Sequence, residues 1–97
     1  MYESKMKSAE TDHLFEAILS LKDLETCYRF FDDLCTFSEI TAMTQRLQVA
    51  ELLRSGKTFS QISRETGVSS ATITRVNKCL SYGAGGYEAV LDAIKKE

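Results

Sequence analysis

Small hydroxyl side chains and long cations are interleaved between residues 69 and 78. If this segment is helical, one of its faces presents hydroxyls and an apolar methyl, groups that contact base edges and thymine methyls in the major groove of DNA. The free N–H groups of the helix N-terminus suit phosphate. The pattern therefore predicts DNA recognition. The residues of this face are Ser69, Ser70, Ala71, Thr74, Arg75 and Lys78.

The residues before this segment have the pattern of a helix-turn-helix over about 59–80. Such a unit needs an apolar and a small residue in its first helix, a glycine turn with an apolar plug, and an inward stripe in its second helix. These places are filled in order by Ile62, Ser63, Gly67, Val68, Ile73 and Val76. We therefore add four residues to the predicted DNA-binding surface, namely Ser60, Ser63, Arg64 and Thr72.

Capping signals and helical periodicity predict the helices that position this unit. Thr36 to Glu39 reads as a capping box, and the helix it opens runs about 17 residues to Gly56. Thr58 to Gln61 is a second capping box, opening a short helix that Gly67 ends. Ser69 can cap the recognition helix, which carries Ile73, Val76 and Leu80 on one stripe.

Both ends of the chain also show helical spacing. Thr11 or Asp12 can cap a first helix, and a second start appears near residues 22–23, so residues 11–34 form either two helices or one bent helix. A glycine-rich loop at residues 83–86 precedes a last amphipathic helix beginning near Tyr87. The chain has no proline and shows no period-2 alternation, so the fold class is all-α. We expect a flexible N-terminus at residues 1–10 and one DNA-binding domain at 11–97.

Charge is distributed unevenly along the chain. The net charge is −2, yet residues 1–45 carry −5 and residues 46–82 carry +4. A local basic block in an acidic protein is typical of a polyanion site, although a solvated charged face explains the charge alone equally well.

Several classes of function lack support. The three cysteines are scattered and fit small buried hydrophobes in a reducing cytoplasm. With a single histidine, the chain shows neither metal-ligand spacing nor a catalytic triad, and we predict no enzyme activity, no catalytic residue and no metal. No apolar run approaches 18 residues, so no signal peptide or membrane span is expected.

Two groups of residues resemble a known family. Glu51 to Arg54 and Ala71 to Arg75 are similar to the Trp repressor family. The segments 44–47 and 79–83 are more similar to the YerC/YecD-type branch of this family in bacteria. The resemblance covers about residues 11–96 and implies an intertwined all-helical homodimer with a Trp-repressor-like fold.

The sequence supports a dimer independently of this resemblance. Its N-terminal third offers more apolar surface than one helix face uses, and a chain of 97 residues has a thin core of its own. Two recognition helices, roughly 34 Å apart, would then read a palindromic site in double-stranded DNA. The expected protein is a bacterial, cytoplasmic, nucleoid-associated transcriptional regulator, most simply a repressor. The alternative is a protein-interaction module that keeps the helix-turn-helix as a packing unit.

The resemblance also implies a possible effector pocket, formed by Thr36, Arg46, Arg75, Val76 and Cys79. Arg46 and Arg75 match two arginines that flank tryptophan in the family's repressor, the first of them only if a gap is allowed after Gly56. Val76 replaces a glycine and would intrude on the indole, and Cys79 replaces a serine that serves the ligand's amino group. We therefore expect no cofactor and no binding of L-tryptophan; a different small-molecule effector remains possible.

Overall fold

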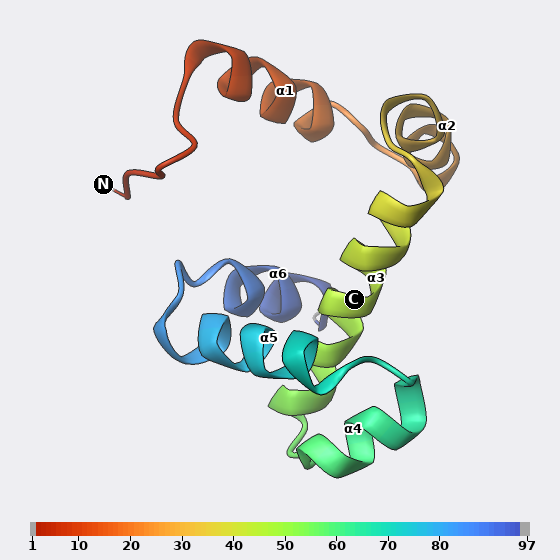
Figure 1. Ribbon diagram of the computed structural model, residues 1–97. Coiled ribbons are helices and arrows are strands. Elements are labelled where there is room, and N and C mark those ends of the chain that lie inside the picture. The colour runs from red at the N-terminus through yellow and green to blue at the C-terminus, as the bar shows by residue number, and fades with distance from the viewer. Residues whose placement is uncertain (1, 96–97) are drawn as a thin grey trace. The chain divides into compact units, whose positions relative to one another are not determined.

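The computed structural model describes residues 2–95, which form six helices and no strand (Figure 1). The all-α prediction is confirmed. The helices are α1 Ala9–Leu19, α2 Leu24–Leu34, α3 Phe37–Arg54, α4 Phe59–Thr66, α5 Ser70–Tyr82 and α6 Gly86–Lys95. None of them, within residues 2–95, is long and apolar enough to cross a membrane. The chain divides into two compact units, residues 1–36 and 37–97, which are described separately below.

The N-terminal unit contains two separate helices with different caps. Ser8 caps α1 by accepting a hydrogen bond from the Thr11 N–H at 3.0 Å. The prediction of a cap at Thr11 or Asp12 was wrong, because the Ser8 hydroxyl lies three residues before Thr11 and α1 begins at Ala9. Asp23 caps α2, and the Thr26 N–H that donates to its carboxylate at 2.7 Å lowers the pKa of Asp23.

Neither helix of this unit has a buried residue. The large apolar side chains of α1 and α2 instead face solvent over much of their surface, with Leu19 82% exposed, Leu24 76% and Tyr28 69%. Soluble monomers seldom leave several large apolar side chains of one small unit this exposed. The N-terminal unit of a single chain therefore has no closed core of its own.

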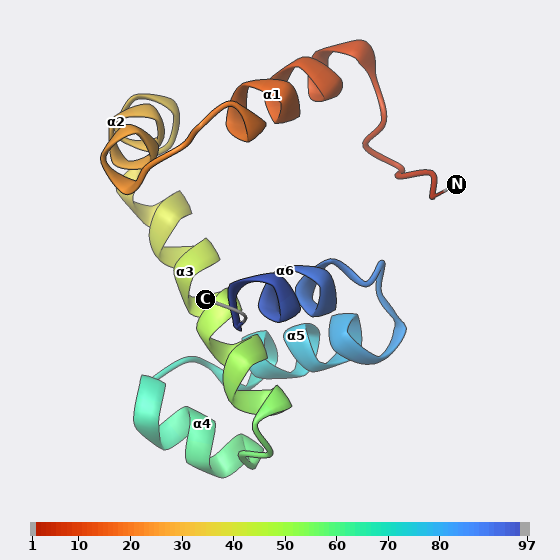
Figure 2. The same cartoon turned by 180° about the vertical axis from the view of Figure 1, so that it is seen from behind.

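The C-terminal unit is built around α3. Figures 1 and 2 show α4, α5 and α6 arranged around the C-terminal half of α3, and each of the three contacts it. All of the buried apolar residues lie in this unit and form one cluster of Val49, Ala50, Ile62, Val68, Ile73, Val76 and Leu91. The core of the described chain therefore holds the helix-turn-helix against α3.

Arg54 links the end of α3 to α6. Its guanidinium donates a hydrogen bond to Asp92 at 2.8 Å and lies 3.7 Å from the Glu88 carboxylate. The hydrogen bond to Asp92 raises the pKa of Arg54 above its already high usual value, so this side chain stays charged. One cation of the basic block is therefore paired with carboxylates of the C-terminal unit.

Candidate DNA-binding site

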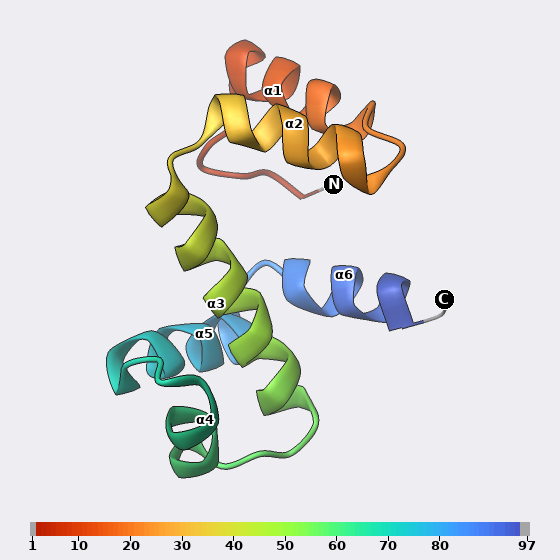
Figure 3. The same ribbon diagram turned by 90° about the vertical axis from the view of Figure 1, so that its right-hand side faces the viewer.

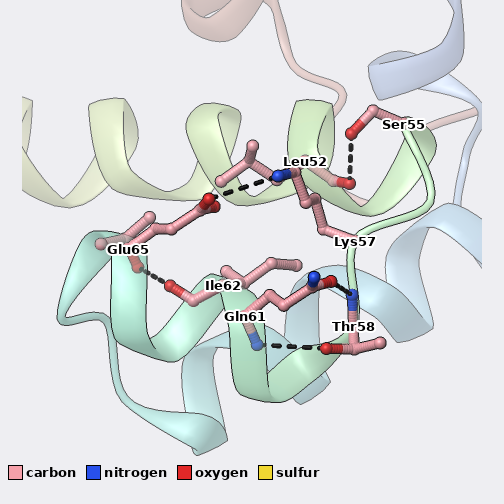
Figure 4. Close-up of polar contacts among 8 residues, drawn as sticks. Leu52, Ser55, Lys57, Thr58, Gln61, Ile62 and Glu65 are labelled. Atoms are coloured by element: carbon pink, nitrogen blue, oxygen red, sulfur yellow. Dashed lines mark hydrogen bonds and ion pairs between the residues drawn. The ribbon is translucent and has the colours of Figure 1, made fainter.

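Helix α4 begins with the predicted capping box at Thr58. The Gln61 N–H donates to the Thr58 hydroxyl at 3.1 Å, and the Thr58 N–H donates to the Gln61 side-chain oxygen at 2.8 Å (Figure 4). Lys57 donates to Glu65 at 3.3 Å across the same helix. The two capping hydrogen bonds satisfy the backbone N–H groups of Thr58 and Gln61 and set where the helix starts.

The turn between α4 and α5 depends on Gly67 and Val68. Gly67 ends α4 in the left-handed region with φ 72°, and its N–H donates to the Ser63 carbonyl. The next residue, Val68, is 4% exposed and packs into the core as the predicted apolar plug. The Thr66 hydroxyl accepts from the Val68 N–H at 3.1 Å and so supports the turn.

Replacing Gly67 with alanine is expected to lower the free energy of unfolding by about 1 kcal/mol, because a Cβ disfavours the left-handed region. The space around Gly67 is open, so the backbone conformation alone causes this cost. Gly86→Ala is the matched control, since Gly86 has equally open space without a positive φ. Urea denaturation should separate the two variants, and equal effects would contradict this account.

Helix α5 begins at a cap formed by Ser69 and Thr72, two residues whose hydroxyls were predicted to bind DNA. The Ser69 side chain accepts from the Thr72 N–H at 3.3 Å and donates to the Thr72 hydroxyl at 3.1 Å. Thr72 is also half-buried, whereas Ser69 is exposed. The structure therefore gives Ser69 and Thr72 a role in starting the helix.

The other side chains of α5 divide into two opposite faces. Ile73 and Val76 are 0% and 1% exposed and face the core, as predicted. The face opposite to them is exposed along the whole helix. Figure 3 shows α5 lying against α3. Its exposed predicted residues are Ser70, Ala71, Thr74, Arg75 and Lys78.

The cations near this face differ in their pairing. Arg54 and Lys57 form ion pairs within the C-terminal unit. Within residues 2–95, Arg64, Arg75 and Lys78 are exposed and pair with no carboxylate. Three unpaired cations on α4 and α5 are available to phosphates, which dominate affinity for DNA.

Two details of the site differ from the sequence pattern. Ser63, predicted as the small residue between the helices, is exposed, whereas Ile62 of α4 and Ile73 of α5 both belong to the buried cluster. Ser60, predicted to contact DNA, is exposed near the start of α4. The pattern also missed Asn77, an exposed residue in the second half of α5, which helical spacing from Thr74 could have found.

The family model described as Trp repressor protein matches residues 9–95 of this chain. The chain belongs to the Trp repressor family. It is 58% identical over 92 residues to the uncharacterised protein YerC of Bacillus subtilis, covering 95% of this chain and 88% of that one. The Trp repressor family comprises DNA-binding regulators and not enzymes.

Two solved structures share this Trp repressor fold. The crystal structure of a candidate Trp repressor from Staphylococcus aureus has a TM-score of 0.90 and 47% identity, covering 96% of this chain and 93% of that one. The structure of a TrpR-like protein from Eubacterium eligens has a TM-score of 0.89 and 47% identity, covering 94% of both chains. The predicted Trp-repressor-like fold is thereby confirmed.

The residues implied as an effector pocket lie in different environments within this family member. Val76 is buried in the core, Arg46 is half-buried, and Arg75 and Cys79 are exposed. Thr36 is exposed and ends the N-terminal unit. Cys79 lines an open, mostly apolar pocket of about 460 Å³ with Leu47, residues 83–86, Tyr87 and Val90, and neither arginine lines it.

Proposed function

We propose that this protein is a sequence-specific DNA-binding transcriptional regulator that reads its site with α5. The exposed face of α5 carries this proposal, together with three cations on α4 and α5 that pair with no carboxylate among the described residues, Arg64, Arg75 and Lys78. Ser70 and Thr74 supply hydroxyls and Ala71 a methyl where base edges would lie. Membership of a family of DNA-binding regulators supports this assignment.

Selection of bound duplexes from a random pool by the full-length chain tests the proposal. A regulator that reads DNA with α5 should enrich an inverted repeat whose half-sites are about one helical turn apart. Its affinity for that sequence should exceed its affinity for random DNA by about 10³-fold or more. Recovery of a pool without sequence preference would overturn the proposal.

The active species in this proposal is a homodimer in which the α1 and α2 surfaces of two chains cover one another. The support is the exposure of Leu19, Leu24 and Tyr28 in a unit without buried residues. A two-fold dimer buries the same patch on both chains and presents two copies of α5 to a palindrome.

Light scattering at micromolar concentration should give twice the mass of one chain. Replacing Leu24 and Tyr28 by glutamine should weaken the dimer, because both are apolar, exposed and one turn apart on α2. The matched control replaces Glu25 and Arg29 by glutamine, an exposed ion pair at the same spacing with a separation of 3.0 Å. A monomeric natural chain would contradict the dimer and would favour the surface as a site for another protein.

L-Tryptophan is not the effector in this proposal. The Val76 side chain replaces the family glycine and is packed in the core, and Cys79 replaces the serine. Isothermal titration calorimetry of the full chain with L-tryptophan should show no heat of binding at concentrations up to the millimolar range. A saturable isotherm with micromolar affinity would show that the pocket accepts the indole despite Val76.

We further propose that the regulator acts as a repressor on the nucleoid in the bacterial cytoplasm. An α5 bound in the major groove near a promoter would exclude other proteins from the same DNA. A reporter fused to a promoter that carries the selected inverted repeat should rise when the gene for this chain is deleted, and a fall would instead show an activator.

A further inference from the structure

Asn77 occupies a position that folding does not explain. It is the eighth residue of α5, a helix of 13 residues, and it is exposed. Asparagine is less favourable than alanine in a helix interior by roughly 0.6 kcal/mol. Within residues 2–95 its side-chain amide neither donates nor accepts a hydrogen bond. Neither core packing nor a local hydrogen bond therefore accounts for this residue.

The helix geometry places Asn77 on the same side of α5 as Ser70 and Thr74. Residues at i, i+4, i+7 and i+11 follow one side of a helix, and Ser70, Thr74, Asn77 and Ser81 have this spacing and are all exposed. We call these four residues the outward stripe; it flanks the exposed face opposite Ile73 and Val76, and Asn77 lies on its edge nearest the core. Ile73, Val76 and Leu80 form the stripe that packs in or against the core.

Distances along the helix place Asn77 within reach of base pairs adjacent to those of Thr74. With a rise of about 1.5 Å per residue, Asn77 lies roughly 4.5 Å beyond Thr74 and 10 Å beyond Ser70 along the axis. Base pairs follow one another every 3.4 Å or so. Arg75 and Lys78 each follow a stripe residue by one position, so their long side chains reach the phosphates beside the groove.

The chemistry of the outward stripe distinguishes Asn77 from the other three residues. A serine or threonine hydroxyl can donate to or accept from several bases, and so discriminates weakly. An asparagine side chain offers a donor and an acceptor in one plane, which match N7 and the 6-amino group of adenine. The bases that Ser70, Thr74 and Ser81 can contact are less sharply defined.

We propose that Asn77 reads an adenine in each half-site and is the main determinant of base preference on α5. This inference rests on the proposed DNA-binding function and deepens it. Among the residues of the outward stripe, only Asn77 can make a bidentate contact with a base, and the helix-turn-helix pattern does not include this residue. Asn77 is also the single amide on that stripe.

Random-pool selection with the natural chain and with Asn77→Ala tests this inference. Alanine favours the helix, so the variant should fold at least as stably. The natural chain should prefer adenine at one position of each half-site by about 10-fold or more, and the variant should lose that preference while keeping the other positions. Gln48→Ala is the matched control, because it removes an exposed amide from the interior of α3, away from α5, and it should keep the full consensus.

Fluorescence anisotropy with modified duplexes identifies the atoms involved. Replacing the selected adenine by 7-deazaadenine removes N7 and should weaken binding by the natural chain about 5-fold or more, with little effect on the variant. An equal loss of affinity for every sequence in Asn77→Ala would indicate a phosphate contact and would overturn the inference, as would an unchanged consensus. A natural chain without any consensus would instead overturn the proposed function.

Discussion

Replacing Ile73 with alanine is expected to lower the free energy of unfolding by about 2–5 kcal/mol. Ile73 is 0% exposed and belongs to the cluster that joins α5 to α3 and α4. The substitution removes apolar contacts and leaves a cavity that the short helices around it can close only in part. A small domain has a total stability of only about 5–15 kcal/mol, so this loss is a large share of it.

Urea denaturation followed by circular dichroism measures this effect, with all chains at one concentration because dimerisation adds to apparent stability. Thr74→Ala is the matched control, since Thr74 is the next residue of α5 and is exposed. Its stability should be unchanged or slightly raised, because alanine favours a helix. A loss below about 1 kcal/mol for Ile73→Ala would mean that Ile73 is not a core residue.

Replacing Arg64, Arg75 and Lys78 together with alanine is expected to lower DNA affinity by on the order of 10³-fold at 0.1 M salt. The three cations are exposed and, among the described residues, have no carboxylate partner to neutralise them. Each contact with a phosphate releases counterions, so each one lost makes the slope of log K against log salt shallower by about 0.9. All sequences should be weakened alike.

Anisotropy titrations between about 50 and 200 mM salt measure both the affinity and the slope. The control chain carries Lys5, Lys22 and Lys95 as alanine, which changes the net charge equally outside α4 and α5. We expect this control to lose less than about 10-fold in affinity. Equal losses in the two triple variants would show attraction by net charge alone and would argue against a site on α4 and α5.

The sequence predicted the C-terminal unit well because its signals are local. The capping box at Thr58, the glycine stop at residue 67 and the cap at Ser69 each act within a few residues, and all three are present. The inward stripe of Ile73 and Val76 is buried as helical periodicity predicted. Periodicity and capping are sufficient to predict the bounds and the buried side of a helix that has a single apolar face.

The remaining features depend on spatial neighbours. Whether Arg54 or Lys57 is free for phosphate depends on Asp92, Glu88 and Glu65, and charge counting along the chain cannot reveal these partners. The cap at Ser8 was missed because Thr11 and Asp12 are equally good capping types. The helix-turn-helix pattern does not specify every position of α5. A residue such as Asn77 can be assigned to the site only when the exposed side of α5 is known.

The N-terminal unit also differs from what its sequence pattern predicts. Its apolar side chains have helical spacing, which normally predicts a buried face, yet neither α1 nor α2 has a buried residue in the single chain. Periodicity shows that a face is apolar but not which molecule covers it. The proposed dimer gives that face a partner of the same kind.

The most direct test of the central claim is an NMR titration of the ¹⁵N-labelled full chain with the selected duplex. If α5 reads DNA, the largest saturable amide shifts should fall on residues 58–78, with Ser70, Thr74 and Asn77 among them. The amides of α6 beyond Glu88 should change little. Shifts confined to α1 and α2, or no saturable shift with any duplex, would contradict the claim.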